Sequence, residues 1–155
     1  MQINWKQLLI SIGISLGIGA LAGFLTQNSM EVYNQLKQPV LSPPGWVFPI
    51  VWTILYILMG ISAYLVYESN SPNKEKALTI YEWQLFFNFL WSIIFFNLQN
   101  ILLAFFVLII LWILIVVMIK SFKEINPLAA WLQIPYLLWV TFAGYLNLML
   151  YTLNQ

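Results

Sequence analysis

The 155-residue sequence contains no cysteine and no histidine, and only 7% of its residues are charged. Thiol catalysis, haem ligation by Cys or His, and the usual zinc sites are therefore excluded. Soluble domains carry about 25% charged residues, so a chain that is 62% hydrophobic is not an ordinary soluble domain. A net charge of +1 also offers no basic surface for nucleic acid.

Long apolar segments are abundant instead. They cover residues of about 8–25, 46–67, 78–96, 101–119 and 127–150. Each is long enough to cross a bilayer as a helix. The polar segments between them are too short to be domains, so we expect an all-α membrane protein. The prediction is one domain over 1–155, a bundle of five transmembrane helices in contact with lipid.

The distribution of lysines predicts the orientation in the membrane. With five spans, the N-terminus and the second and fourth loops share one side. That side carries Lys6, Lys74, Lys76, Lys120 and Lys123, and the other side carries Lys37. Because cytoplasmic loops are rich in Lys and Arg, we expect a cytoplasmic N-terminus and an external C-terminus. A helical bundle favours the bacterial cell membrane over the outer membrane, whose proteins are mostly barrels.

Aromatic and amide side chains recur at helical spacing in three of the spans. They are Trp52 and Tyr56, then Gln84, Asn88, Trp91 and Phe95, then Tyr136, Trp139, Ala143 and Asn147. Residues three or four apart share one helix face, and polar groups within a span usually face the bundle interior or a cavity. We therefore expect Trp52, Trp91 and Trp139 to line a cavity. For Trp46, Trp83 and Trp131 the interfacial aromatic belt is expected.

Small residues form a row in the first span, namely Ser11, Ser15, Gly19 and Gly23, with Gly13 and Gly17 on a second row. Such rows let helix backbones approach closely in lipid. Packing inside one bundle and a homodimer face are both compatible with this pattern. In the fifth span, Pro135 removes a backbone hydrogen bond and is expected to bend the helix.

Ionisable residues are almost absent from the spans, so no proton relay or charged pore ring can be assembled. This argues against an ion-coupled pump. It suits a site for a large, apolar, aromatic ligand held by stacking and a few amides. No metal and no resident cofactor are expected.

Several segments resemble the TspO/MBR family, the tryptophan-rich sensory proteins and translocator proteins (peripheral-type benzodiazepine receptors). They are Tyr33-x-x-Leu36-x-x-Pro39, SPPGWVFPIVWTILY from Ser42 to Tyr56 with Met59-Gly60, Gln84-Leu85-x-x-Asn88-x-x-Trp91, Ala129-Ala130-x-Leu132, Pro135-Tyr136-x-x-Trp139 and Phe142-Ala143-x-x-Leu146-Asn147. The resemblance extends over about 120 residues and four of the expected spans. The proline-glycine-tryptophan segment alone is highly specific.

The resemblance implies a five-helix bundle, commonly a homodimer, with a pocket that a partly helical first loop covers. It implies binding of porphyrins such as protoporphyrin IX and of related flat apolar ligands, in a receptor or carrier for porphyrin sensing, transport or disposal. Carried over by motif, the ligand-binding residues are Tyr33, Pro44, Trp52, Asn88, Trp91, Trp139 and Ala143. Alternatives are light-dependent porphyrin degradation, with Trp52 and Trp139 beside the ring, and a regulatory scaffold acting through protein partners.

Three departures from the family pattern bear on the ligand. Many members have tryptophan where this chain has Val32 and Leu41, so two loop indoles are missing. Porphyrin capture or photochemistry that relied on them would be weaker. Animal members bind cholesterol through a pattern with a basic residue after a tyrosine. Here Thr152-Leu153-Asn154-Gln155 follows Tyr151, so cholesterol is not expected.

Overall fold

A computed structural model of the protein describes residues 2–155, apart from the side chain of Val32. Within this range the chain is helical and has no strand, which confirms the all-α prediction. The elements are α1 (Trp5–Thr26), η1 (Gln27–Ser29), α2 (Met30–Gln35), α3 (Val47–Tyr67), α4 (Lys74–Ser92), η2 (Ile93–Asn97), α5 (Ile101–Ile125), α6 (Pro127–Leu132) and α7 (Ile134–Leu153). The element η1 is a 3-10 turn and η2 is a π-helical turn.

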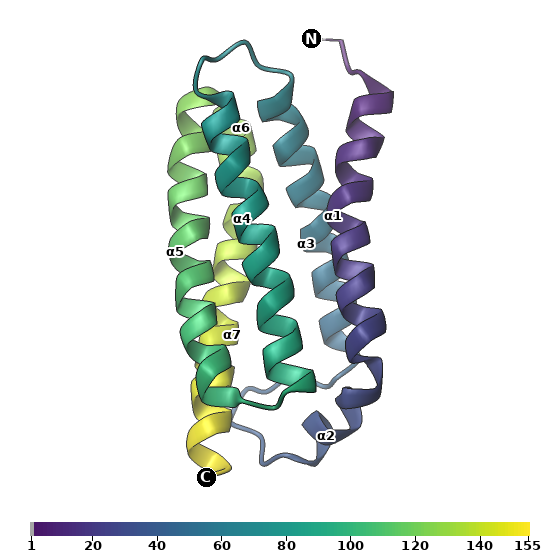
Figure 1. The fold of residues 1–155 in the computed structure, drawn as a ribbon, viewed down its shortest axis with the longest axis vertical. Helices are drawn as coiled ribbons and strands as arrows, with labels where there is room; N and C mark the ends of the chain where they lie inside the picture. The colour runs from purple at the N-terminus through teal and green to yellow at the C-terminus, as the bar shows by residue number, and fades with distance from the viewer. Residues whose placement is uncertain (1) are drawn as a thin grey trace.

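The long helices run side by side along the long axis of the molecule (Figure 1). The N-terminus and the α3–α4 connection lie at one end, and α2 and the C-terminus lie at the other. Among the described residues, four helical segments are long and apolar enough to span a membrane: α1 with η1, α3, α5, and α6 with α7. Helix α4 packs on α5 but is less apolar, because it carries Lys74, Glu75, Lys76 and Glu82.

Helices α1 and α3 are held together by small residues and hydroxyl groups. The Ser11 hydroxyl donates to the carbonyl of Gly60 at 2.7 Å, and the Ser15 hydroxyl donates to the carbonyl of Tyr56 at 2.6 Å. A Cβ added to Gly60 would stand 2.5 Å from the Cα of Ile12. Only glycine permits this approach, so the beginning of the row, at Ser11 and Ser15, packs within the chain.

The glycines of α1 differ in their surroundings. A Cβ at Gly19 would meet the Tyr56 ring, which places Gly19 against α3 as well. Gly13 and Gly17 are exposed, and no other described residue comes within 4 Å of a Cβ built there. Gly23, at the end of the first row, is exposed too and has no other described residue within 4 Å of a built Cβ. The first row therefore packs against α3 only from Ser11 to Gly19.

The segment expected as one span over 127–150 is interrupted at Gln133, where α6 ends and α7 begins. The cause is Pro135, which has no N–H to donate to the carbonyl of Trp131 four residues earlier. The N–H of Gln133 turns back to the carbonyl of Ala130 at 3.1 Å, which closes α6. The expected bend at Pro135 is thus a break between two helices.

The first loop lies across the end of the bundle that carries the C-terminus (Figure 1). It begins with η1 and α2 and continues through residues 36–46 to α3. The backbone of Leu41 is in the left-handed region at φ 73°. This loop forms the roof of the cavity described next.

Candidate ligand pocket

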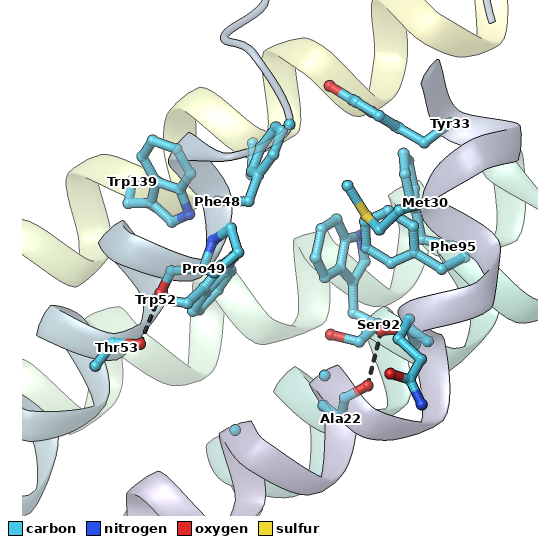
Figure 2. Close-up of a pocket in the computed structure, with 18 of the residues that line it drawn as sticks. Ala22, Met30, Tyr33, Phe48, Pro49, Trp52, Thr53, Ser92, Phe95 and Trp139 are labelled. Carbon is cyan, nitrogen blue, oxygen red and sulfur yellow. Dashed lines mark hydrogen bonds between the residues drawn. The ribbon is translucent and has the colours of Figure 1, made fainter. Parts of the chain in front are cut away.

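A cavity of about 790 Å³ lies between α1, α3, α4 and α7, with α2 and the first loop beside it. Its aromatic lining consists of Tyr33, Trp46, Phe48, Trp52, Tyr56, Trp91, Phe95, Phe96 and Trp139. In Figure 2, Phe48, Trp52 and Trp139 lie on one side of the pocket. Met30, Tyr33 and Phe95 lie on the other side. Its volume falls in the range of about 300–1,000 Å³ that is usual for small-molecule sites.

Trp52 is the centre of the aromatic lining. Its ring centroid lies 6.4 Å from that of Trp91 and 6.4 Å from that of Trp139, at 38° and 89° respectively. The centroid of the Tyr56 ring lies 5.6 Å from that of Trp52. Because the three indoles come from α3, α4 and α7, the packing of these helices fixes the shape of the pocket. Flat apolar ligands gain most from such a lining.

The wall formed by α1 consists mostly of small residues, together with Leu16 and Thr26. Gly19, Ala20, Ala22 and Gly23 all line the pocket. Sequence reasoning left Gly19 and Gly23 either to packing inside one bundle or to a homodimer face, and did not associate this helix with the ligand. The signal available in the sequence was the same row of small residues, which leaves space as well as permitting close approach.

The indole nitrogens of two lining tryptophans are used differently. Trp91 Nε1 donates to Asn147 Oδ1 at 3.0 Å, and the amide nitrogen of Asn147 donates to the carbonyl of Ile101. Trp139 Nε1 is buried and has no hydrogen-bond partner among the described residues. Figure 2 shows this nitrogen turned toward Phe48 and Trp52. A buried N–H without a partner costs about 1–3 kcal/mol, so Trp139 is suited to donate to a ligand.

Asn88 belongs to a buried polar network next to the pocket. Its Oδ1 accepts from the Tyr56 hydroxyl at 2.5 Å, and its Nδ2 donates to the Tyr136 hydroxyl at 2.8 Å. The Tyr136 hydroxyl donates in turn to Gln84 Oε1 at 2.7 Å. Asn88, Gln84 and Tyr136 are buried and are not among the lining residues. The motif assigned Asn88 to ligand contact, whereas the structure places its amide between two tyrosines.

Tyr33 contributes to the roof. Its ring meets Phe48 edge-on at 5.5 Å between centroids. Its hydroxyl shares a 3.2 Å hydrogen bond with the Ser42 hydroxyl, which donates to Gln38 Oε1 at 2.7 Å. Burial raises the pKa of the Tyr33 phenol, and the hydrogen bond with Ser42 offsets part of this rise. The residue is therefore a neutral phenol at physiological pH.

Five of the seven residues assigned by motif line the same pocket: Tyr33, Trp52, Trp91, Trp139 and Ala143. Pro44 is not among the lining residues, although its neighbour Gly45 is. Leu41, which replaces one of the loop tryptophans of the family, is 77% exposed and lies away from the lining. The other replaced position, Val32, has a side chain outside the described part of the structure.

The tryptophans assigned to the interface point outward. Trp46, Trp83 and Trp131 are each more than half exposed. Trp46 also reaches the lining of the pocket. Sequence reasoning missed Phe48 and Pro49, which line the pocket one helical turn or less before Trp52. Their position on the same helix face as Trp52 was the available signal.

The apolar helices and the aromatic cavity between them define a helical membrane protein with an internal small-molecule pocket. The sequence profile of the TspO/MBR family matches residues 11–152, and the chain belongs to this family. It is therefore an integral membrane protein.

Relatives of the chain come from archaea, bacteria and animals. The chain is 37% identical over 153 residues to "Tryptophan-rich protein TspO" of Archaeoglobus fulgidus, which covers 98% of this chain and 99% of that protein. It is 34% identical over 154 residues to "Tryptophan-rich sensory protein" of Cereibacter sphaeroides, with 99% and 95% covered. It is also 30% identical over 155 residues to "Translocator protein" of Sus scrofa, with 95% and 91% covered.

Proposed function

We propose that the protein is a membrane receptor or carrier that binds tetrapyrroles, such as protoporphyrin IX, in the aromatic pocket. The observation that carries this proposal is the arrangement of Trp52, Trp91 and Trp139 around one cavity of about 790 Å³. A flat ring could stack on these indoles. Each aromatic pair contributes about 0.5–1.5 kcal/mol beyond the burial of its area.

The polar contacts and the free space in the pocket fit the same class of ligand. Trp139 Nε1 would donate to an oxygen or ring nitrogen of the ligand. Ala143 and the glycines of α1 leave the width that a macrocycle needs. Tyr33 would cover one edge of the bound ring. Asn88 would act indirectly, by holding Tyr56 and Tyr136 behind Trp52.

The membrane arrangement that accompanies this function is a single domain of five transmembrane helices, in which α4 crosses together with the four more apolar segments. From the distribution of lysines we propose a cytoplasmic N-terminus and a C-terminus outside the bacterial cell membrane. In a homodimer, the exposed row of Gly13 and Gly17 would be the available small-residue face.

The test is to titrate the purified protein with protoporphyrin IX in the dark. Tryptophan fluorescence and the Soret absorption band of the porphyrin are the two readouts. Saturable quenching is expected. A Trp52→Phe, Trp139→Phe variant should bind about tenfold more weakly or worse, since two stacking partners shrink and one N–H donor is lost. Trp131→Phe, on the exposed surface, is the matched control. The proposal fails if the parent protein shows no saturable component.

A second candidate function is light-dependent porphyrin degradation. It is favoured by the position of electron-rich indoles around the cavity, with Trp52 6.4 Å from both Trp91 and Trp139. Light-excited porphyrin would activate dissolved oxygen, which oxidises the ring, and the protein would supply the positioned indoles. Under equal illumination, the parent should then destroy the Soret band faster than the Trp52→Phe, Trp139→Phe variant. Equal rates with equal occupancy would exclude this role.

The regulatory scaffold is the weakest of the three functions. It was expected to present the small-residue row of α1 to a protein partner. Ser11, Ser15 and Gly19 instead pack against α3. Of the small residues of α1, this leaves Gly23 and the second row of Gly13 and Gly17 for a partner.

A further inference from the structure

A group of buried polar atoms lies beyond the inner tryptophans, on the side away from the first loop. Gln84 and Gln133 are both completely buried. Gln84 Nε2 and both polar side-chain atoms of Gln133 have no hydrogen-bond partner among the described residues. The Tyr81 hydroxyl is also buried and has no such partner. None of the three residues lines the ligand pocket, so a ligand bound there does not supply the missing partners.

These three residues occupy neighbouring positions on two helices that run in the same direction. Both α4 and α7 run from the end with the α3–α4 connection to the end with the C-terminus (Figure 1). Gln84 on α4 and Tyr136 on α7 are hydrogen-bonded through their side chains, so they lie level with each other. Tyr81 and Gln133 each precede one of this pair by three residues, about one helical turn. Because helical side chains lean toward the N-terminus, the Gln84 amide leans toward the level of Tyr81 and Gln133.

The surroundings of Gln133 do not satisfy its side chain. The break between α6 and α7 is closed by the backbone alone: the N–H of Gln133 donates to the carbonyl of Ala130 at 3.1 Å, and its carbonyl accepts from the N–H of Leu137 at 3.1 Å. The segment Pro127–Leu153 is apolar enough to span a membrane, and lipid chains offer no hydrogen bonds. A buried polar group without a partner destabilises the fold more than an apolar group of the same shape. The two glutamines therefore need a partner from outside the chain.

The kinds of atoms that lack a partner indicate what this ligand is. The amide nitrogens of Gln84 and Gln133 can only donate a hydrogen bond, and the Gln133 oxygen can only accept one. The Tyr81 hydroxyl can do either. A metal ion needs acceptors alone, and an anion needs donors alone. Water donates and accepts, and a buried water molecule typically makes about three hydrogen bonds to such groups.

We propose that Gln84, Gln133 and Tyr81 form a binding site for ordered water inside the membrane-spanning bundle. Water in this site accepts from Gln84 Nε2 and donates to Gln133 Oε1. Gln133 Nε2 or the Tyr81 hydroxyl provides its third hydrogen bond. The proposal does not depend on which ligand the pocket binds.

The water site completes a chain of hydrogen bonds that begins at the pocket. Tyr56 lines the pocket and donates to Asn88, and Asn88 donates to Tyr136. Tyr136 donates in turn to Gln84 Oε1. Water that accepts from Gln84 Nε2 fixes the orientation of this amide and keeps its oxygen turned to Tyr136. The bound water thereby sets the direction of every hydrogen bond back to Tyr56.

The experiment is radiolytic labelling of the purified protein in lipid nanodiscs, read out by peptide mass spectrometry. A short X-ray exposure splits bound water into hydroxyl radicals, which add oxygen to the side chains that the water contacts. A radical scavenger in the bulk solution protects residues that bulk water reaches, such as Tyr67, which is 48% exposed. Tyr81 is only 6% exposed, and we expect it to be labelled with the scavenger present. An unlabelled Tyr81 in the parent protein overturns the proposal without any variant.

A Gln84→Leu, Gln133→Leu variant removes both amides at similar side-chain volume. Labelling of Tyr81 should fall by about tenfold or more, since the water loses its hydrogen bonds to both amides. Gln35→Leu, at an exposed position of α2, is the matched control and should keep the labelling of the parent. Equal labelling of Tyr81 in the double variant would mean that water reaches it by another route, and would overturn the site.

The stability of a Gln133→Leu variant separates a hydrated site from a dry one. At a dry site, leucine would remove two unpaired polar atoms and make the protein more stable. With water bound, we expect the equilibrium constant for folding to fall by about tenfold, because the water and Gln84 lose a partner. Reversible unfolding in mixed micelles measures this constant, and a more stable variant contradicts the proposal. If the parent binds no porphyrin, the proposed function fails, while labelling and stability still decide on the water site.

Discussion

The Tyr56 hydroxyl on α3 donates a 2.5 Å hydrogen bond to the Asn88 side chain on α4. Through Asn88, the bond continues to Tyr136 on α7. One amide thus links the three helices that supply the pocket's inner tryptophans. The network supports the pocket from outside its lining. Substitutions in the network are therefore predicted to lower the stability of the fold more than the affinity for the ligand.

Asn88→Ala should lower the free energy of unfolding by about 1–3 kcal/mol, because it leaves two buried tyrosine hydroxyls without one of their partners. Denaturation in detergent micelles measures this. Asn70→Ala, an exposed position in the α3–α4 loop, is the control and should change little. Equal stability of the two variants would show that the network contributes nothing to the fold.

Trp139→Phe should weaken the binding of ligands that carry a hydrogen-bond acceptor, by about five- to tenfold for one lost hydrogen bond. A purely apolar ligand of similar shape should lose less. Trp139 Nε1 has no partner within the described structure, so the protein itself loses no hydrogen bond. Isothermal titration with the two kinds of ligand makes the comparison. An equal loss for both kinds would mean that stacking alone accounts for the contribution of Trp139.

Gly60→Ala should destabilise the protein by about 1–3 kcal/mol, the usual cost of overpacking. The added methyl group would stand 2.5 Å from the Cα of Ile12 and 2.9 Å from its nitrogen, and backbone atoms cannot move aside cheaply. Gly13→Ala is the matched control, because a Cβ there meets no other described residue within 4 Å. Alanine favours the helix by about 1 kcal/mol over glycine. The two substitutions should therefore act in opposite directions in the same unfolding assay.

Alkaline pH should open the roof of the pocket. The pKa of Tyr33 is raised in the closed structure, chiefly by burial, so the closed state binds its proton more tightly than an open one. The contribution of the Tyr33 phenol to the stability of the closed state is fully present below about pH 10, the usual tyrosine pKa. It is lost as the pH rises through the higher pKa of Tyr33 in the closed state. Acrylamide quenching of the pocket tryptophans across this range measures it. Tyr33→Phe should remove the part of the pH dependence of quenching that comes from this phenol. Any contribution from lysines should remain.

The helices were predictable because each long apolar run has few ways to satisfy its backbone in lipid except as a helix. The aromatic lining was predictable because Trp52, Trp91 and Trp139 lie on helix faces that also carry polar groups. The role of Asn88 was not predictable from the sequence. Spacing places Asn88 on an inward helix face, but it does not show which hydroxyl groups of other helices the amide contacts. The break at Gln133 followed from Pro135, but the extent of the disruption depends on the packing of α6.

The pocket-lining part of α1 could not be recognised from periodicity for a related reason. A row of small residues indicates close approach of backbones, and Gly19 does pack against Tyr56. Further along the same helix, Gly23 meets no described residue within 4 Å of an added Cβ, and it lines the pocket. The sequence pattern is identical in both cases. Only the packing of α1 against the other helices, which its own sequence does not show, decides between contact and cavity.

The α1 wall also determines how easily the capacity of the pocket can change in evolution. The width of the pocket next to α1 is set by the small side chains of Ala20 and Gly23. The pocket can therefore become narrower there without a change at any aromatic residue. A single larger residue on this face would shorten the longest ligand that fits while leaving the indoles in place. Relatives with the same tryptophans can therefore differ in the size of the molecules that they accept.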